Sequence, residues 1–189
     1  MDLLWVVLAY LLGSLSFGRI VGAIKGINLA ERDTPGASGT WRQFGPAWGV
    51  LVALADTAKG SLVAYLSGLL QTPWALPLMG AAVVAGHNWP LFFGFRGGGG
   101  IAPSLGFFLF LHPGITLTAV VIGLAVAGFY WQLYWKSHRQ SWYPIPVGAV
   151  VGYAYALIAF WPTGMGFWAL LLVSLTVALR GLRLATNKL

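Results

Sequence analysis

Lysine and arginine residues fall in alternate connections between the long apolar runs of this chain, and this pattern strongly limits the possible folds. The apolar runs cover residues 3–24, 47–70, 75–93, 102–111, 114–135, 145–161 and 165–179. The connections with Lys or Arg are 25–46, 94–101, 136–144 and the C-terminal tail, whereas 71–74, 112–113 and 162–164 have none. A helix needs about 20 apolar residues to cross a bilayer. The sequence therefore predicts a membrane protein.

The number of crossings depends on the short run 102–111. If it crosses, every Lys and Arg outside a span lies on one side, which the positive-inside rule makes cytoplasmic. If it re-enters instead, six segments remain. We therefore predict an all-α, polytopic membrane helical bundle of about seven transmembrane segments, with the N-terminus outside and the C-terminus cytoplasmic.

The composition excludes several classes of protein. Hydrophobic residues make up 58% of the chain and charged residues 8%, against about 25% charged in a soluble domain. No polar stretch is long enough to bury a core of its own, so residues 1–189 form one integral-membrane domain. Four acids and three separated histidines predict no metal site. The cations are scattered one or two per loop, which argues against nucleic-acid binding.

A glycine run follows a single cation in Arg96-Gly97-Gly98-Gly99-Gly100. Consecutive glycines let backbone N–H groups face an anion, and a helix that begins near residue 102 adds the partial positive charge of its N-terminus. We expect a phosphate cradle here. A flexible loop in which Arg96 serves only as a topology anchor remains the alternative.

A second polar stretch, TPGASGTWRQFG, covers residues 34–45. Thr34, Ser38 and Thr40 supply hydroxyl groups, Gly36 supplies backbone freedom, and Arg42 supplies charge. Such a segment can line a phosphate site. It can equally be an ordinary cytoplasmic turn.

Two ionisable groups, Asp56 and Lys59, lie within one apolar run and share a helix face. Charges inside the membrane usually mark a site or face a partner. Lys59 could face the anion, or the pair could only neutralise itself and tie helices together. His87, near the end of another run, could be a general base or a buried structural histidine.

The order of these motifs resembles one family. AYLLGSLSFG at 9–18, PGAS with Arg42 at 35–42, GVLVALADTAKG at 49–60 and GHNWPLFFGFRGGGGIA at 86–102 resemble the bacterial acyl-phosphate:glycerol-3-phosphate acyltransferases, the PlsY family. The family pattern at the last motif is close to GHxxPxFxxFKGGKGxAT. The resemblance covers nearly the whole chain.

The resemblance implies acyl transfer from acyl phosphate to the 1-hydroxyl of glycerol 3-phosphate, giving lysophosphatidic acid and phosphate. It implies no metal or other cofactor, and a bacterial inner membrane with the active site on the cytoplasmic face. The residues expected to be catalytic are His87, Arg96 and Arg42. Those expected to bind substrate are Thr34, Gly36, Ser38, Asn88, Gly97, Gly98, Gly99, Gly100, Asp56, Lys59 and Arg180.

Some positions depart from the family pattern. Arg96 stands at the first lysine of the family's KGGKG motif and keeps its positive charge. Gly99 stands at the second lysine of that motif and has no charge. Two other functions therefore stay open. A paralogue without transfer activity could bind lipid or anions, or act as a partner subunit. An anion transporter would fit the buried pair, although the sequence lacks the repeat typical of transporters.

Overall fold

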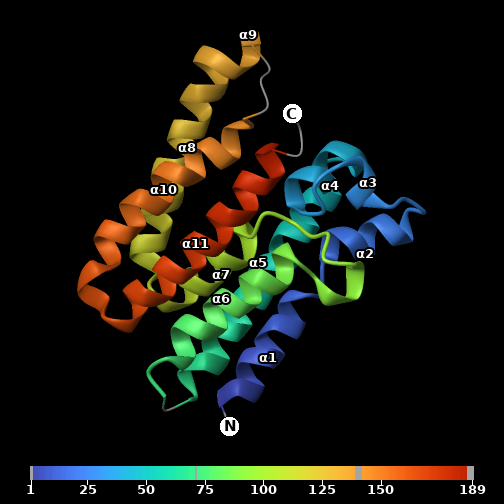
Figure 1. The fold of residues 1–189 in the computed structure, drawn as a ribbon. Helices are drawn as coiled ribbons and strands as arrows, with labels where there is room; N and C mark the ends of the chain where they lie inside the picture. Colours follow the sequence, from blue (N-terminus) through green and yellow to red (C-terminus); the bar gives the residue numbers. More distant parts are fainter. Residues whose placement is uncertain (1, 71, 139–141, 187–189) are drawn as a thin grey trace.

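The computed structural model describes residues 2–70, 72–138 and 142–186, and nearly all of this part of the chain is helical (Figure 1). Within it, the helices of eleven residues or more are α1 (Asp2–Gly13), α5 (Pro46–Gly68), α6 (Ala75–Asn88), α7 (Ile101–Leu111), α8 (Pro113–Tyr130), α10 (Pro144–Phe160) and α11 (Met165–Thr186). The shorter elements are α2 (Phe17–Ile24), α3 (Leu29–Arg32), α4 (Ala37–Phe44), the 3-10 turns η1 (Leu91–Phe93) and η3 (Trp161–Thr163), the π-helical turn η2 (Trp131–Trp135) and α9 (Lys136–His138). No strand occurs in the described residues, which confirms the predicted all-α class.

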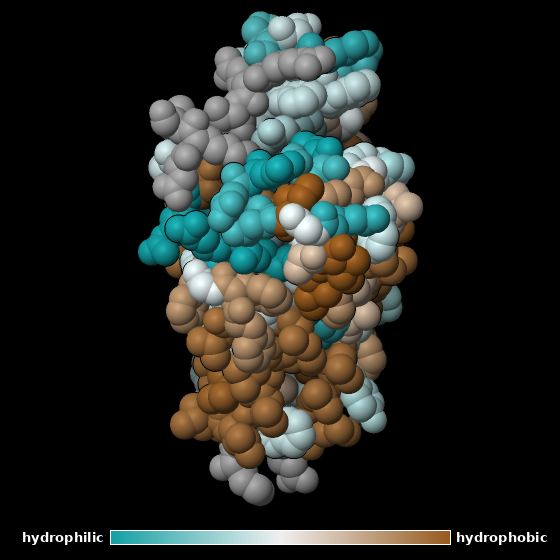
Figure 2. Space-filling model, turned by 90° about the vertical axis from the view of Figure 1, so that its right-hand side faces the viewer, coloured by the Kyte–Doolittle hydropathy of each residue, from teal (hydrophilic) through white to brown (hydrophobic). Residues whose placement is uncertain are grey.

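The connections gather at two opposite ends of the bundle (Figure 1). The start of α1, the α7–α8 turn and the α10–α11 turn lie at the lower end of the view. The elements α2 to α4, the glycine-rich segment, α9 and the end of α11 lie at the upper end. Figure 2 shows a mostly apolar lower half and hydrophilic side chains gathered in the upper half. The polar chemistry of the described chain is therefore concentrated at one end.

Five helical stretches are long and apolar enough to cross a membrane, namely Leu3–Ile24, Pro46–Gly68, Pro113–His138, Pro144–Thr163 and Met165–Thr186. Helix α7 is a shorter apolar helix. Helix α6, with 14 residues, is about 21 Å long at 1.5 Å per residue. These lengths fit a multi-pass membrane protein, and the total of seven crossings stays a prediction.

Three predicted boundaries differ from the structure. The run 3–24 is not one straight helix, because α1 ends at Gly13 and α2 begins at Phe17. The run 75–93 ends as a helix at Asn88 and continues as a 3-10 turn. The last helix extends through Thr186 rather than ending at 179. Long basic side chains can lie on a helix end with their charged groups in water, and they favour its C-terminal dipole.

Glycines set the closest helix–helix contacts. A Cβ atom on Gly60 of α5 would overlap the backbone of Pro103 in α7, and one on Gly106 of α7 would overlap the backbone of Thr57. Gly123 of α8 approaches the backbone of Gly148 in α10 in the same way. Lipid tails give no hydrophobic drive for helices to associate, so close backbone packing of small residues holds such a bundle together.

We expect Gly106→Ala to lower thermal stability in detergent, because its methyl group has no room against the α5 backbone. Overpacking typically costs about 1–3 kcal/mol, which corresponds to a fall of roughly 2–12 °C in Tm for a chain of this size. Gly128→Ala in α8 is the matched control, because a Cβ there meets nothing within 4 Å. Equal melting temperatures for the two variants would contradict this packing.

Candidate active site

The glycine-rich segment turns back on the end of α6. Gly97 N–H donates to the carbonyl of Asn88 at 3.2 Å, and Gly98 N–H donates to the carbonyl of His87 at 3.1 Å. The turn is made by Gly94 and Phe95, which both have left-handed backbone conformations, with φ of 62° and 60°. The amides of Gly97 and Gly98 are therefore engaged within the protein. The expectation that they face an anion is corrected by this pairing.

The open amides lie further along, at the start of α7. Gly100 caps this helix in a left-handed conformation, with φ of 86°. No backbone carbonyl among the described residues accepts from the N–H groups of Gly99, Gly100, Ile101 or Ala102. We call these four amides the anion cradle. A helix N-terminus with free N–H groups attracts negative charge.

Arginines approach the glycine-rich segment from two directions. Arg180 of α11 donates to the carbonyls of Gly97 at 2.7 Å and Gly98 at 3.0 Å, so it holds the loop from the side of the last helix. Arg96 is exposed beside the cradle, and no polar contact of its guanidinium is found among the described residues. Arg183, three residues further along α11, lies 5.8 Å from the ring centroid of Trp89. Cations therefore reach the loop from both α11 and the loop itself.

The segment 34–42 lies against the same loop. A Cβ on Gly36 would stand 3.8 Å from Cα of Gly98, which brings together two motifs that are some 60 residues apart in the sequence. Thr34 is half-buried, whereas Ser38 is exposed on α4. Thr40 is fully buried, and its hydroxyl has no partner among the described residues.

Arg42 is bound to an acid that sequence reasoning did not pair with it. Its Nε donates to Asp33 at 2.8 Å, and a second nitrogen donates to the other carboxylate oxygen at 2.5 Å. Burial works to raise the pKa of the Asp33 carboxyl, but the hydrogen bonds from Arg42 and the Thr34 N–H outweigh it and hold this pKa below its ordinary value. The Arg42 guanidinium also lies 4.6 Å from the ring centroid of Tyr143. Its position is thus fixed in advance.

A cluster of buried ionisable groups lies behind the loop. Lys59 Nζ is 2.8 Å from Asp56, 3.1 Å from Nδ1 of His87, and 2.9 Å from each of the carbonyl oxygens of Gly13 and Leu15. Lys59 is 4% exposed and Asp56 is 0% exposed. The expectation that Lys59 faces the anion is wrong, because its ammonium is surrounded by protein acceptors.

His87 and Asn88 also lie behind the loop. His87 is 2% exposed, and its imidazole contacts Gly98 so closely that a Cβ there would overlap the ring. The general-base expectation for His87 is therefore not met in this arrangement, because a substrate hydroxyl has no path to the ring. The Asn88 amide donates to the carbonyl of Thr176 in α11 at 3.3 Å, and its oxygen packs beside Gly100. Both residues support the cradle from inside the protein.

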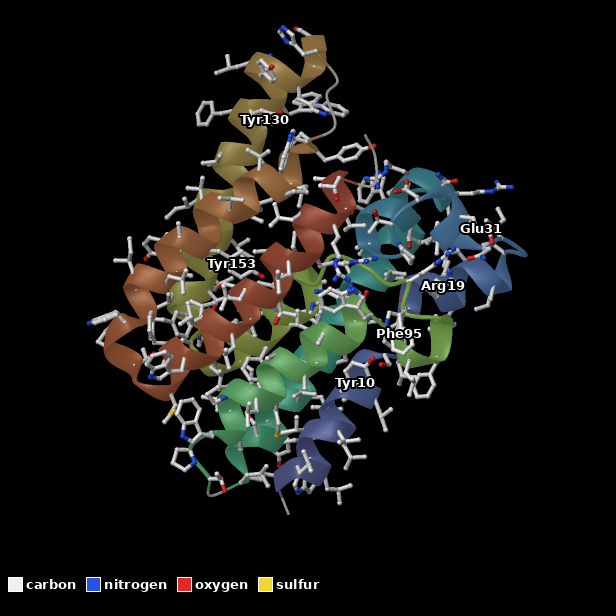
Figure 3. The ribbon with its side chains drawn as sticks, in the orientation of Figure 1. Tyr10, Arg19, Glu31, Phe95, Tyr130 and Tyr153 are labelled. Atoms are coloured by element: carbon white, nitrogen blue, oxygen red, sulfur yellow. The ribbon has the colours of Figure 1, made fainter. Side chains whose placement is uncertain are left out.

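An apolar groove of about 200 Å³ is lined mainly by residues of α7, α8 and α10. Ile101, whose amide belongs to the cradle, lines its upper part, and Phe108 and Phe160 line it further down. One polar pair occurs on its wall, where Tyr153 projects from α10 toward α7 (Figure 3) and hydrogen-bonds with Ser104. The cradle and the groove thus share one residue, Ile101.

A family model described as glycerol-3-phosphate acyltransferase matches residues 3–183. Glycerol-3-phosphate acyltransferase 2 of Deinococcus radiodurans is 46% identical over 155 residues, which is 77% of this chain and 79% of that protein. Glycerol-3-phosphate acyltransferase of Aquifex aeolicus is 31% identical over 177 residues, covering 91% of this chain and 88% of that protein.

Solved structures give the same result. The glycerol 3-phosphate form of PlsY (YgiH), an integral membrane glycerol 3-phosphate acyltransferase, superposes with a TM-score of 0.80 at 29% identity, over 98% of this chain and 89% of that one. Its lysophosphatidic acid form gives a TM-score of 0.79 at 27% identity, over 95% and 87%.

We expect Gly98→Ala to weaken phosphate-ligand binding by about tenfold or more. The added methyl group overlaps the His87 ring, and relieving an overlap of this kind costs about 1–3 kcal/mol or displaces the loop. Titration of the purified protein with glycerol 3-phosphate measures the effect. Gly181→Ala is the control, because it lies next to Arg180 and a Cβ there meets nothing within 4 Å. Unchanged affinity in Gly98→Ala would contradict the contact.

The lowered pKa of Asp33 predicts a pH-dependent stability difference. The folded state favours the ionised carboxylate, so its contribution is present above the unfolded pKa of about 3.9 and is lost as pH falls through the lower folded pKa. Asp33→Asn should lower Tm at pH 7 by about 1–4 °C. The difference from the native chain should narrow below about pH 4. Thermal unfolding in detergent at pH 7 and pH 3 measures this, and an equal difference at both would contradict the ion pair.

Proposed function

The chain belongs to the glycerol-3-phosphate acyltransferase family, and on this premise we propose that it acylates the 1-hydroxyl of glycerol 3-phosphate with an acyl phosphate as donor. One observation carries the choice of donor. Ile101, whose amide is one of the four of the anion cradle, also lines an apolar groove. A substrate that is an anion at one end and an alkyl chain at the other fits both parts.

The reaction needs alignment more than proton-transfer machinery. The hydroxyl oxygen attacks the acyl carbonyl carbon, a C–O ester bond forms, and the bond from that carbon to the phosphate oxygen breaks. The hydroxyl proton leaves with the departing phosphate, so no protein base is required. Acyl phosphate is already activated, and holding both substrates in line can supply most of the acceleration. This suits a site where His87 is buried behind the loop.

The phosphate groups bind where amides and guanidinium groups are available. The cradle amides of Gly99 and Gly100 with Arg96 and Arg180 take one phosphate, and the segment with Thr34, Gly36, Ser38 and Arg42 takes the other. Charge-assisted hydrogen bonds of this type contribute about 1.5–3 kcal/mol each. Contact between Gly36 and Gly98 supports this arrangement, because it places the two anion sites side by side.

The acyl tail occupies the groove between α7, α8 and α10, with its lower part near Phe108 and Phe160. The groove is almost entirely apolar, and its one hydroxyl pair, Ser104 and Tyr153, is satisfied internally. Transfer of alkyl groups from water into this groove contributes roughly 0.8 kcal/mol per methylene. This length-dependent term favours acyl donors over short phosphate esters.

The polar end of the bundle faces the cytoplasm of a bacterium, and the bundle crosses the inner membrane seven times. The positive-inside rule supports this orientation, because the connections with Lys and Arg share that end (Figure 1). The N-terminus then lies outside. Substrate and product pass between water and lipid at this same end.

Purified protein in detergent, given palmitoyl phosphate and labelled glycerol 3-phosphate, should form labelled lysophosphatidic acid. We expect Arg180→Gln to lower kcat/KM by about tenfold or more, because the loop loses charge-assisted bonds. Lys136→Gln is the matched control, since Lys136 is a cation on α9 that contacts Trp131 rather than the cradle. Arg96→Ala should also lower turnover.

Other results would overturn the proposal. Absence of product with retained phosphate-ligand binding would indicate a paralogue without transfer activity. Flux of labelled anion into proteoliposomes without product would indicate transport. Full activity in Arg180→Gln would remove the loop contact from the mechanism.

A further inference from the structure

Lys59 is at a position that no part of the proposed chemistry uses. Lys59 Nζ donates to the backbone carbonyls of Gly13 and Leu15, each at 2.9 Å, and lies 3.1 Å from Nδ1 of His87. The carboxylate of Asp56, at 2.8 Å, is its counter-ion. Lys59 is 4% exposed and cannot reach a substrate. Burying a charged pair is costly and is often no better for stability than apolar packing, so its role needs another explanation.

The acceptors of Lys59 belong to two different parts of the site. The carbonyls of Gly13 and Leu15 lie at the break between α1 and α2. From there α2 continues to Gly18, where a Cβ would stand only 3.0–3.1 Å from the backbone of Pro35 and Gly36. One side of Lys59 therefore leads to the segment 34–42.

The other side leads to the glycine loop. Lys59 and Asp56 both lie beside Nδ1 of His87, at 3.1 and 3.4 Å. The opposite edge of the same imidazole contacts Gly98. Gly98 in turn faces Gly36. The contacts thus form a closed ring, which starts and ends at Lys59 and passes through the segment 34–42 and the glycine-rich segment 96–100.

We propose that Lys59 is a positioning residue that fixes the register, meaning the relative position, of the segment 34–42 and the glycine loop, residues 96–100. This inference rests on the proposed function, because register matters where two substrates must meet. Each segment can still bind its own phosphate without Lys59, but the two bound groups lose alignment. A displacement of 1 Å can lower a rate by about 10²-fold. The effect therefore falls on kcat rather than on KM.

The double variant Asp56→Asn with Lys59→Met tests this, because it removes both buried charges together and leaves no unpaired ion. We expect a folded protein with a lower Tm, because the carbonyls of Gly13 and Leu15 lose their donor. KM values should stay within about threefold and kcat should fall by at least tenfold, as misalignment predicts. Ser67→Ala is the control on the same helix, since Ser67 is buried and its hydroxyl donates to the carbonyl of Ala64, one turn earlier in α5. Native kcat in the double variant would overturn the proposal, as would a parallel rise in KM.

A distance measurement tests the register without relying on turnover. The chain has no cysteine, so spin labels can be attached at Gln43→Cys on α4 and Phe92→Cys on η1, both of which are exposed. The double variant should broaden or shift the distance distribution between the labels. An unchanged narrow distribution overturns the proposal even if the native chain has no transferase activity, which would refute the proposed function alone.

A milder variant keeps the test decisive if the double variant does not fold. Gly18→Ala should press on Pro35 and Gly36 by a few tenths of an ångström and leave Lys59 in place. It should lower kcat severalfold with little change in KM, and it should shift the same label distance. Native kcat with an unshifted distance would overturn the proposal.

Discussion

The break after Gly13 is the constraint on which the site depends. Ending a helix within an apolar run leaves carbonyl groups without helical partners, and a lipid environment offers no water to satisfy them. Lys59 donates to two of these carbonyls. The break in turn lets α2 leave the line of α1 (Figure 1) and reach the segment that contains Gly36. Lys59, a buried cation on α5, thus allows the first apolar run, residues 3–24, to break and to contribute α2 to the polar end of the bundle.

Glycine serves two purposes in this chain, and only one of them is flexibility. Gly98 is needed because the His87 ring occupies the space of a side chain, and Gly60 and Gly106 are needed because α5 and α7 touch through their backbones. Gly100 alone combines a left-handed φ with a position in the cradle. The glycine-rich segment is consequently a packed structure that is held by α6 and α11.

The sequence predicted the broad arrangement well because that arrangement depends on side-chain chemistry. Runs of apolar residues and the alternating positions of Lys and Arg predicted the helices and the end that gathers polar groups. The errors concern backbone partners. Nothing in the sequence indicated that Lys59 binds the carbonyls of Gly13 and Leu15, or that the amides of Gly97 and Gly98 are already paired. Backbone acceptors have no residue signature, so such contacts are found only in three dimensions.

The supply of positive charge to the loop explains how Gly99 can stand where the family pattern has a lysine. Charge near an anion acts through distance, and its source can be any element that reaches the site. Arg180 reaches the loop from α11, which continues well past its predicted end. Arg180 donates to the carbonyls of Gly97 and Gly98, so its positive charge is paired with the negative ends of these two carbonyl dipoles. In the proposed site, a guanidinium held in this way offsets the lost lysine charge, and a Cβ on Gly99 would meet nothing within 4 Å, which leaves space beside the open amides.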